Sequence, residues 1–483
     1  LSSAASDVYK RQAMTMLAAF TACGGGDSDK SGSESRTKSE DDVKISADAS
    51  INEGDPDIKG QTISWLSYYD VNPTGNDDRS IALTLFEDVY GAKVEWISTT
   101  YETKYDDLAN RLLGGDPVDM FPYEWDAVPN GVYKNQYQPL DDYIDLEDEL
   151  WADVKGLADK MEYKGAHYVV PYCISDPVCI IYSRQMMEDE GLDDPYELYQ
   201  KGEWDWDAFM SMMKSFVNNA DDGETRYGCT GWFGQALVQS TGQTIVNYDG
   251  TKFTNNVMNP EIEQAELILE EIAKTNLYDT AWHSFFPDDG SVLFYGMAPW
   301  ALSESNGKNP DGDIFLVPFP KMPGSDEYFL CTSFGAKMLV ANSDKGDAVA
   351  AYIKCERIAA TDEQYTSAAR EKALIPTVNA SGEKTKYITE EQWDMWQSLM
   401  DPANVTPVFD FGYGMGSRMT DETYDYNTRG VMKNLTDALI TKYEGAPSSW
   451  AELRDSWKAV IDEEIAKYNC CLLYTSDAAD DKA

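Results

Sequence analysis

The sequence predicts an α/β protein with more than one domain. From about residue 61 onward, candidate strands alternate with candidate helices, a pattern typical of a mainly parallel sheet flanked by helices. Roughly 415 residues lie between a polar N-terminal stretch and the end of the last candidate helix, which is more than one hydrophobic core normally supports. Because 42% of the 483 residues are hydrophobic, the chain can build two such cores. We therefore expect two lobes.

Both ends of the chain are set aside before the fold is considered. DNA that encodes residues 2–12 can be read on the opposite strand, in a shifted frame, to give residues 471–480. We interpret 1–12 and 471–483 as translated sequencing-adapter scars, because two strands of one tag produce this relation and a folded protein does not.

Residues 13–22 are interpreted as a truncated lipoprotein signal peptide. A short apolar run there ends in Thr-Ala, and Cys23 and Gly24 follow. In such signals the cysteine becomes the lipidated N-terminus. Most of segment 23–57 is polar, so it cannot bury enough apolar surface to order itself, and we expect a flexible tether. The alternatives are a truncated secretory signal or a chance cysteine.

The first lobe begins with strand–helix–strand–helix–strand. The strands are expected at 61–66, 93–97 and 118–121, and the helices at 80–90 and from Tyr105 to a Gly114-Gly115 stop. Ligands of parallel sheets bind beyond the carboxyl ends of the strands. The loops that follow the first and third strands, 68–72 and 122–126, are therefore the loops expected to carry a site.

The second lobe shows the same alternation. An apolar strand is expected at 178–182 and a helix from Trp206 with Asp205 as N-cap. Residues 260–274 form a helix that starts with proline and has an apolar face, and a last helix begins after a Ser449/Glu452 capping box.

Composition excludes several classes of function. A net charge of −46 repels nucleic acid and anionic lipid. No segment of the mature chain is apolar enough to span a bilayer. Five cysteines of the body show no metal-ligand spacing and are assigned no disulfide, namely Cys173, Cys179, Cys229, Cys331 and Cys355. No P-loop, GxGxxG or HExxH motif is present, so no cofactor or metal is expected.

Several stretches resemble one family when taken in order. They are GAHYVVP at 165–171, IIYS at 180–183, WDWD at 204–207, GMAPW at 296–300, DIFLVPFP at 313–320 and GDAVAAYI at 346–353. Their order and spacing are similar to those of extracellular solute-binding lipoproteins of bacterial ABC importers, in the carbohydrate-binding, maltose-binding-protein-like group. No single stretch is specific, and the resemblance covers about 58–469.

The resemblance implies a two-lobed periplasmic-binding-protein-like clamp whose chain crosses between lobes three times. The crossings are expected near 171–176, 317–320 and 374–377. Lobe one is then 58–172 with 318–374, and lobe two is 175–316 with 378–469. A monomer would capture a sugar or oligosaccharide in the cleft and deliver it to the permease subunits of an ABC transporter. Cys23 would anchor it to the extracellular face of the cytoplasmic membrane.

A pyranose has apolar C–H faces and a rim of hydroxyls, so its site needs aromatic platforms and polar side chains. The strand-end loops, the first crossing, the segment after Met297 and the loop 409–418 supply both kinds. The expected ligand-binding residues are Tyr69, Asp70, Glu124, Trp125, Asp126, Asp176, Trp300, Phe411, Tyr413 and Arg418. Purely structural roles stay open for three of these positions. Trp300 would then be a core residue, Asp70 would form a turn, and 409–418 would be a connector that packs on its lobe. Pro177 after Asp176 departs from the family pattern.

Two other classes of protein remain in view. A secreted glycoside hydrolase shares the acidity and the aromatic content, and it needs only a pair of carboxylates, which 85 acidic residues can supply. However, the chain shows no succession of eight strand–helix units. A surface adhesion protein predicts repeats or short sandwich-like strands, and neither is visible. We expect a binding protein rather than an enzyme.

Overall fold

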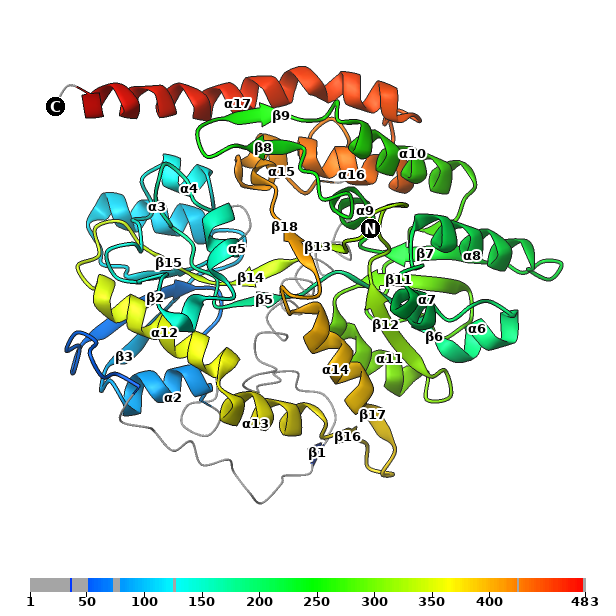
Figure 1. Ribbon diagram of the computed structural model, residues 1–483, viewed down its shortest axis with the longest axis horizontal. Coiled ribbons are helices and arrows are strands. Elements are labelled where there is room, and N and C mark those ends of the chain that lie inside the picture. The colour runs from blue at the N-terminus through cyan, green and yellow to red at the C-terminus, as the bar shows by residue number, and fades with distance from the viewer. Residues whose placement is uncertain (1–34, 37–50, 73–78, 125–126, 424, 481–483) are drawn as a thin grey trace. The chain divides into compact units, whose positions relative to one another are not determined.

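The computed structural model describes residues 35–36, 51–72, 79–124, 127–423 and 425–480, with side chains as far as Asn469. Its chain divides into two compact units (Figure 1). Unit 1 comprises Leu1–Glu124, Gly131–Asp176 and Phe334–Glu383, and unit 2 comprises Trp125–Asn130, Pro177–Ser333 and Lys384–Ala483. Each unit holds a sheet with helices packed on it, so the α/β prediction is confirmed.

The sheet of unit 1 has four strands in the order β15-β4-β2-β3. Its strands are β2 (Thr62–Ser67), β3 (Lys93–Ser98), β4 (Met120–Pro122) and β15 (Lys337–Leu339). Strand β2 runs parallel to both β3 and β4, and β15 is antiparallel to β4. The carboxyl ends of β2, β3 and β4 therefore meet at one edge.

Local sequence explains the helices that connect these strands. Helix α2 (Ile81–Asp88) starts at Ser80, whose hydroxyl accepts the backbone N–H of Leu83 at 3.1 Å. Helix α3 (Lys104–Gly114) ends at Gly115, which adopts φ 75°, a left-handed conformation that favours glycine. Both helices and the three strands of the predicted strand–helix alternation are present, with bounds shifted by one or two residues.

The remaining elements of this part of the chain include helix α12 (Gly346–Thr361) and several short helices and strands. Helix α12 packs on α2, with the rings of Tyr352 and Phe86 5.3 Å apart at 87°. The other elements are β1 (Ser35–Arg36), α4 (Asn130–Tyr133), η2 (Glu149–Trp151), α5 (Lys155–Lys160), β5 (Cys173–Ser175), β14 (Ser333–Gly335), α12 (Gly346–Thr361), α13 (Glu363–Ala373) and β16 (Thr377–Val378).

Unit 2 is built on a five-stranded sheet in the order β10-β7-β11-β6-β12. Strand β7 is parallel to β10 and β11, whereas β6 is antiparallel to β11 and β12. The bounds are β6 (Cys179–Ser183), β7 (Tyr227–Gly231), β10 (Tyr278–Asp279), β11 (Val292–Met297) and β12 (Ile314–Pro318). The sheet is thus parallel on one side and antiparallel on the other.

Aromatic side chains fill the core between this sheet and helix α8 (Trp206–Asn218). The rings of Phe209 and Phe294 stack with centroids 4.9 Å apart, and Trp204 meets both edge-on. As predicted, Asp205 caps the helix by accepting the N–H of Ala208 at 3.0 Å. Trp204 and Trp206, at 0% and 2% exposure, are therefore core residues.

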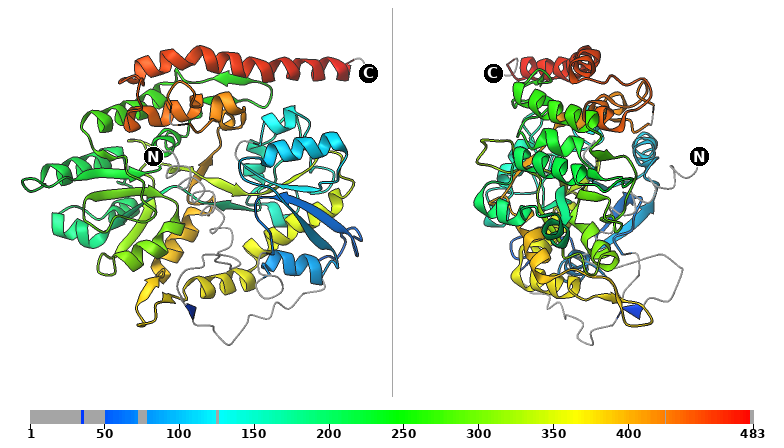
Figure 2. Two further views of the ribbon diagram at one scale, coloured as in Figure 1. Left: turned by 180° about the vertical axis from the view of Figure 1, so that it is seen from behind. Right: turned by 90° about the vertical axis from the view of Figure 1, so that its right-hand side faces the viewer.

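Helices cover the rest of unit 2, and α17 (Trp450–Asp480) lies along strand β9 (Figure 2). Asn469 fixes this contact by accepting the N–H of Phe253 at 2.8 Å and donating to its carbonyl at 2.9 Å. The other elements are α6 (Arg184–Glu190), α7 (Pro195–Lys201), α9 (Gly234–Gln239), β8 (Val246–Tyr248), β9 (Phe253–Asn255), α10 (Pro260–Lys274), η3 (Pro299–Ala301), α11 (Leu302–Lys308), β13 (Phe329–Cys331), β17 (Lys384–Lys386), α14 (Glu390–Leu399), β18 (Thr406–Val408), η4 (Phe411–Gly414), α15 (Ser417–Thr420) and α16 (Val431–Thr441).

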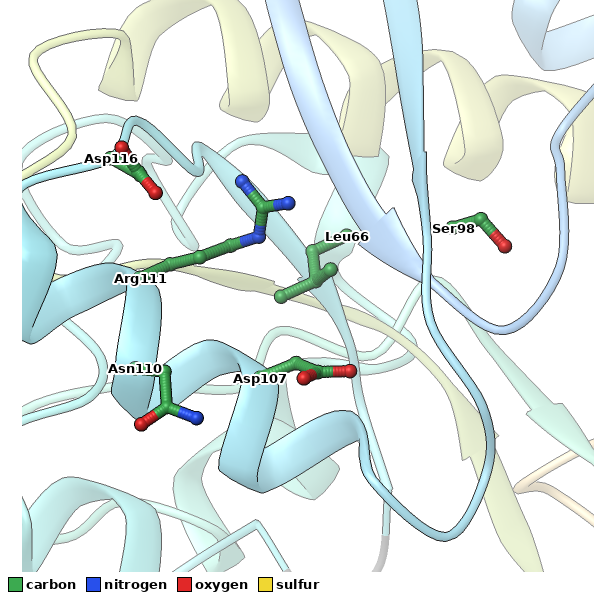
Figure 3. Close-up of a pocket in the computed structure, with 6 residues that line it drawn as sticks. All are labelled: Leu66, Ser98, Asp107, Asn110, Arg111 and Asp116. Carbon is green, nitrogen blue, oxygen red and sulfur yellow. The ribbon is translucent and has the colours of Figure 1, made fainter.

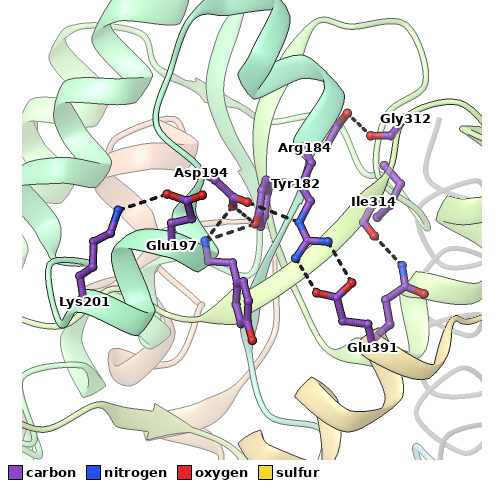
Figure 4. A network of polar contacts seen from close by, with 11 residues as sticks. Tyr182, Arg184, Asp194, Glu197, Lys201, Gly312, Ile314 and Glu391 are labelled. Atoms are coloured by element: carbon purple, nitrogen blue, oxygen red, sulfur yellow. Dashed lines mark hydrogen bonds and ion pairs between the residues drawn. The ribbon is translucent and has the colours of Figure 1, made fainter.

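A polar network centred on Arg184 ties α6, α7 and α14 to strand β12 (Figure 4). The Arg184 guanidinium lies 3.7 Å from the ring centroid of Phe315 and forms ion pairs with Glu391 at 2.9 Å and Asp194 at 3.5 Å. Asp194 also caps α7 and accepts the hydroxyl of Tyr182. Burial and these partners make the network part of the scaffold of unit 2.

The units divide at 124/125, 130/131, 176/177, 333/334 and 383/384, whereas the sequence predicted three crossings and placed the second and third near 317–320 and 374–377. Strand pairing explains the second difference, because 314–318 is strand β12 of the unit 2 sheet. The following residues stay there too: the Pro318 and Pro320 carbonyls accept the indole N–H groups of Trp204 and Trp206 at 2.8 and 3.1 Å. The first predicted crossing, 171–176, adjoins the observed division.

Residues 1–34 and 37–50, which hold the predicted signal segment, Cys23 and most of the tether, lie outside the described residues. The backbone of 471–480 continues helix α17. The interpretation of 471–483 as an adapter scar stays a prediction. Among the described residues, no helix combines the length and the apolar composition that a membrane span requires.

Candidate functional site

Aromatic side chains gather where the parallel strands of unit 1 end. Tyr68 and Tyr69 follow β2, Tyr101 follows β3, and Glu124 follows β4. We call Tyr68, Tyr69, Tyr101, Lys104 and Glu124 the tyrosine edge. Because carboxyl ends of parallel strands are the usual ligand-facing side of an α/β sheet, this edge is the first candidate site.

The rings of the tyrosine edge are in mutual contact. Tyr68 meets Tyr69 and Tyr101 edge-on, with centroids 5.2 and 5.3 Å apart. Its hydroxyl donates a 2.8 Å hydrogen bond to the Glu124 carboxylate. Burial, reinforced by Glu124, raises the pKa of Tyr68 far above its ordinary value, so this hydroxyl stays protonated. Tyr101 is 37% exposed.

Two lysines support these rings from below. Lys104, the first residue of α3, is 4% exposed, and its ammonium lies 3.4 Å from the ring centroid of Tyr101. Lys337 of β15 is 5% exposed and lies 6.0 Å from the Tyr69 ring and 3.1 Å from the Tyr172 hydroxyl. Cation–π contacts of buried ammonium groups stabilise such clusters by about 2 kcal/mol. Each of these two rings therefore has a cation as a neighbour within the protein.

A polar cavity of about 250 Å³ lies beside this edge, between α3 and the ends of β2 and β3 (Figure 3). Its lining residues are Leu66, Ser98, Asp107, Asn110, Arg111 and Asp116. Asp107 accepts hydrogen bonds from Thr99 and Thr103, which hold the loop that carries Tyr101. The cavity therefore shares Asp107 with the hydrogen bonds of that loop.

Unit 2 has its own aromatic group at a carboxyl edge. Trp232 follows β7, and Trp300 stands in η3, three residues after β11. Their rings meet edge-on, with centroids 6.4 Å apart at 67°. Both are half-buried, and the Trp300 indole N–H has no hydrogen-bond partner within the described chain. Gly231, at φ 95°, brings the backbone so close that a Cβ there would stand 2.2 Å from the Gly296 carbonyl oxygen.

Comparison with known proteins identifies the family. A model of bacterial extracellular solute-binding proteins matches residues 73–355, more than half of the chain. The chain belongs to this family. No curated protein sequence matches it.

Solved structures share the fold at low sequence identity. The sugar-binding protein MalE of Xanthomonas citri matches with a TM-score of 0.61 at 12% identity, covering 85% of this chain and 99% of that one. The GacH receptor of Streptomyces glaucescens, solved in complex with acarbose, matches with a TM-score of 0.56 at 14% identity, covering 84% and 98%. The ABC substrate-binding protein Lmo0181 of Listeria monocytogenes, in complex with cycloalternan, matches at 0.54 and 14%, again covering 84% and 99%.

Only some of the predicted site residues of this solute-binding protein lie at the strand-end edges described above. Tyr69 and Glu124 belong to the tyrosine edge. Asp70 accepts the N–H of Asn72 at 3.0 Å, which is the turn-forming role that the sequence left open. Asp176 ends the second segment of unit 1 with φ 47°, and burial raises the pKa of its carboxyl to about 7. Trp300 pairs with Trp232 at the edge described above.

The loop 409–418 has the packing of the connector that the sequence left open as an alternative, and its role in ligand binding stays a prediction. Phe411 and Tyr413 are 3% and 5% exposed, and Phe411 packs on Tyr248, Phe253 and Phe409. Arg418 forms ion pairs at 2.9 and 3.2 Å with Glu463 and Glu464 of α17. Phe411 and Tyr413 are core residues of unit 2, and Asp410 anchors their loop by accepting buried backbone N–H groups. Trp125, Asp126 and Cys23 lie outside the described residues.

Sequence reasoning missed Tyr68, Tyr101, Lys104 and Trp232. Tyr68, Tyr101 and Trp232 each lie within three positions of a strand end, and this position could have marked them as candidates. Of the adjacent residues Tyr68 and Tyr69, the sequence analysis selected only Tyr69. No sequence pattern indicated Lys104, because its place in the tyrosine edge depends on contacts with neighbouring rings. Within the described residues, no group of histidine, cysteine and acidic side chains is arranged to hold a metal ion.

Proposed function

We propose that this solute-binding protein captures a sugar or oligosaccharide and delivers it to the permease subunits of an ABC transporter, without catalysing a reaction. The observation that carries the proposal is the tyrosine edge. There Tyr101, which is 37% exposed, contacts Tyr68, whose hydroxyl is hydrogen-bonded to the Glu124 carboxylate. Solved relatives with the same fold are described as binding acarbose, cycloalternan and β-1,6-galactobiose.

The chemistry of the tyrosine edge suits a neutral pyranose. Tyr101, which is 37% exposed, supplies an aromatic ring of the kind on which the C–H face of a sugar stacks. The Glu124 carboxylate, which accepts the Tyr68 hydroxyl at 2.8 Å, is the kind of acceptor that the hydroxyl rim of a sugar requires. A chain with net charge −46 disfavours anionic ligands at long range. The favoured ligand is therefore an uncharged carbohydrate.

Three further parts of the proposal rest on the sequence. Lipidation of Cys23 would anchor the protein to the outer face of the cytoplasmic membrane, with residues 24–57 as tether. The protein would act as a monomer. Trp125, Asp126 and Asp176 would contribute to the same ligand site as the tyrosine edge.

A thermal-shift screen of the purified chain against mono- and oligosaccharides, polyols and short peptides tests the function. A ligand at 100 times its dissociation constant stabilises the protein by about 2.7 kcal/mol. Each stabilising ligand is recovered and its mass measured. A stabilising, intact carbohydrate supports the proposal, whereas a cleaved product makes this a glycoside hydrolase and a peptide ligand makes it a peptide-binding protein.

A pair of matched variants locates the site. Tyr101→Ala removes the exposed ring of the tyrosine edge and should weaken carbohydrate binding by about 2 kcal/mol. Tyr143→Ala removes a ring of equal exposure, 36% against 37%, that packs over Gly346 at the start of α12. This control should bind like the wild type. Equal affinity of all three proteins would remove the tyrosine edge from the site.

A further inference from the structure

A second cavity of unit 1, of about 190 Å³, is lined by the segment 143–151 and the first turns of helix α12. We call it the acidic cavity. Lys345, which precedes α12, donates a 2.7 Å hydrogen bond to the carbonyl of Thr62, the first residue of β2. Helix α12 thus starts at the amino end of β2, whereas the tyrosine edge follows the carboxyl end of that strand. An occupant of the acidic cavity therefore leaves the tyrosine edge uncovered.

Part of the lining of the acidic cavity is apolar and aromatic. Trp151 and Ile144 are 4% and 7% exposed, and the ring of Tyr143 is 36% exposed. Within the described chain, the indole N–H of Trp151 has no hydrogen-bond partner, although this residue is almost fully buried. A donor in such a position favours an occupant that brings an acceptor. The cavity therefore offers apolar surface together with a hydrogen-bond donor.

Three carboxylates line the same cavity, namely those of Asp145, Asp148 and Asp347. Oδ1 of Asp145 accepts the N–H of Glu147 at 3.0 Å, and Oδ1 of Asp148 accepts the N–H of Leu150 at 2.9 Å. Among the residues that the structure describes, neither the Oδ2 atoms of these two residues nor the carboxylate of Asp347 has a hydrogen-bond or ion-pair partner. Each of the three aspartates can therefore accept a further donor.

The ammonium group in the lining does not neutralise these three carboxylates. Lys354 forms an ion pair with Asp55 at 2.8 Å, and Asp55 also accepts the hydroxyl of Tyr90. The four carboxylates and one ammonium of the lining leave a formal charge of −3. The whole chain, with net charge −46, adds a long-range attraction for cations. The charge of the acidic cavity therefore selects a cationic occupant.

We propose that the acidic cavity binds a lysine side chain presented by a peptide segment of a partner protein. An ammonium is a compact charge with three N–H donors, which suits three separate carboxylates better than the planar fork of an arginine does. The aliphatic stem of the lysine packs on Ile144 and on the ring of Tyr143. A carbonyl of the peptide supplies the acceptor for the indole N–H of Trp151. This inference goes beyond the proposed function, because it assigns a second ligand to the chain.

An NMR titration of the full chain with three probes tests this chemistry. The first probe is the tripeptide Ala-Lys-Ala, acetylated and amidated so that the lysine ammonium is its only charge. The second carries norleucine in place of lysine, and the third is n-pentylamine, which has an ammonium and a stem but no carbonyl. The lysine peptide should bind about tenfold more tightly than either of the others, since both charge-assisted and neutral hydrogen bonds contribute. Added NaCl should weaken its binding.

Matched variants locate the binding. Asp145→Asn/Asp347→Asn removes two charges of the acidic cavity with little change of shape, and it should weaken binding of the lysine peptide by about tenfold. Asp106→Asn/Glu371→Gln removes two exposed charges of unit 1 outside the cavity and should bind like the wild type. Trp151→Phe keeps an aromatic ring without the N–H, and it should weaken the lysine peptide while n-pentylamine binds as before.

The outcomes separate this inference from the proposed function. Equal affinity of the wild type for the lysine and norleucine peptides, or equal affinity of the wild type and Asp145→Asn/Asp347→Asn for the lysine peptide, would overturn the inference. Binding of n-pentylamine as tight as that of the lysine peptide would overturn the assignment to a peptide. A carbohydrate found in the screen should bind Asp145→Asn/Asp347→Asn as tightly as the wild type. If no carbohydrate binds, only the proposed function fails.

Discussion

The carboxyl of Asp410 should make the stability of unit 2 fall as the pH rises from about 4 to about 6. Asp410 is 5% exposed and accepts the backbone N–H groups of Ile245, Val246 and Gly412 at 2.6, 3.2 and 2.9 Å. Burial outweighs these hydrogen bonds and raises the pKa of the carboxyl from 3.8 to about 6. The native state thus holds a proton that the unfolded chain has already released.

The sign and the magnitude follow from that difference. A raised pKa in the folded state gives stability that is fully present below the unfolded pKa, near 3.8, and is lost as the pH passes about 6. The shift is about two pH units, and each unit corresponds to 1.36 kcal/mol, so the loss amounts to about 3 kcal/mol. Asp410→Asn cannot titrate and should lack this loss.

Urea denaturation at pH 4, 5, 6 and 8, followed by tryptophan fluorescence, measures the effect as a difference between wild type and variant. The difference is needed because many of the 85 acidic residues titrate in the same range. Asp249→Asn is the matched control in unit 2: hydrogen bonds from Thr251 and Lys252 lower the pKa of Asp249 to about 2, below the window. Parallel curves for wild type and Asp410→Asn between pH 4 and 6 would refute the reasoning.

Three further predictions concern the edge of unit 2, the clamp mechanism and the scaffold. Trp300→Ala should weaken carbohydrate binding by on the order of 2 kcal/mol while the chain still folds, and isothermal titration giving an unchanged affinity would remove Trp300 from the site. The clamp that the family resemblance implies predicts that saturating ligand lowers the radius of gyration in small-angle X-ray scattering, and an identical radius would contradict closure. Arg184→Met should cost about 1–2 kcal/mol of stability, because it removes the contact on Phe315 at 3.7 Å and the ion pair with Glu391 at 2.9 Å. Lys201→Met breaks an exposed pair with Glu197 and should cost less than about 0.5 kcal/mol, so equal urea midpoints for the Arg184 and Lys201 variants would count against the network.

Local patterns predicted most of the elements of the fold. Pro260–Lys274 is a helix as expected, because its proline start, early acidic residues and apolar face all act within one segment. Asp205 and Ser449 stand at predicted helix starts, where their side chains interact within one turn. Capping and periodicity are properties of neighbouring residues, so one sequence is enough to read them.

Crossings between units were harder to place. The segment 314–318 has the same apolar character whether it ends one unit or begins another. Its assignment depends on pairing with β6, more than 100 residues away in the chain. Strand pairing depends on all the strands of the sheet, so the residues of the segment alone do not predict it.

The sequence by itself determined the class of the protein: an α/β chain with strand-end loops, an acidic charge and a family pattern of short motifs. Only the tertiary structure decided which aromatic residues stand at an edge and which fill a core. Phe411 begins the short helix η4 and Tyr101 stands in a turn, both outside the long helices and the sheets, yet Phe411 is 3% exposed and Tyr101 37%. The reason is physical: burial depends on what packs against a side chain, and the partners of Phe411, as of Lys104, come together only when the chain has folded.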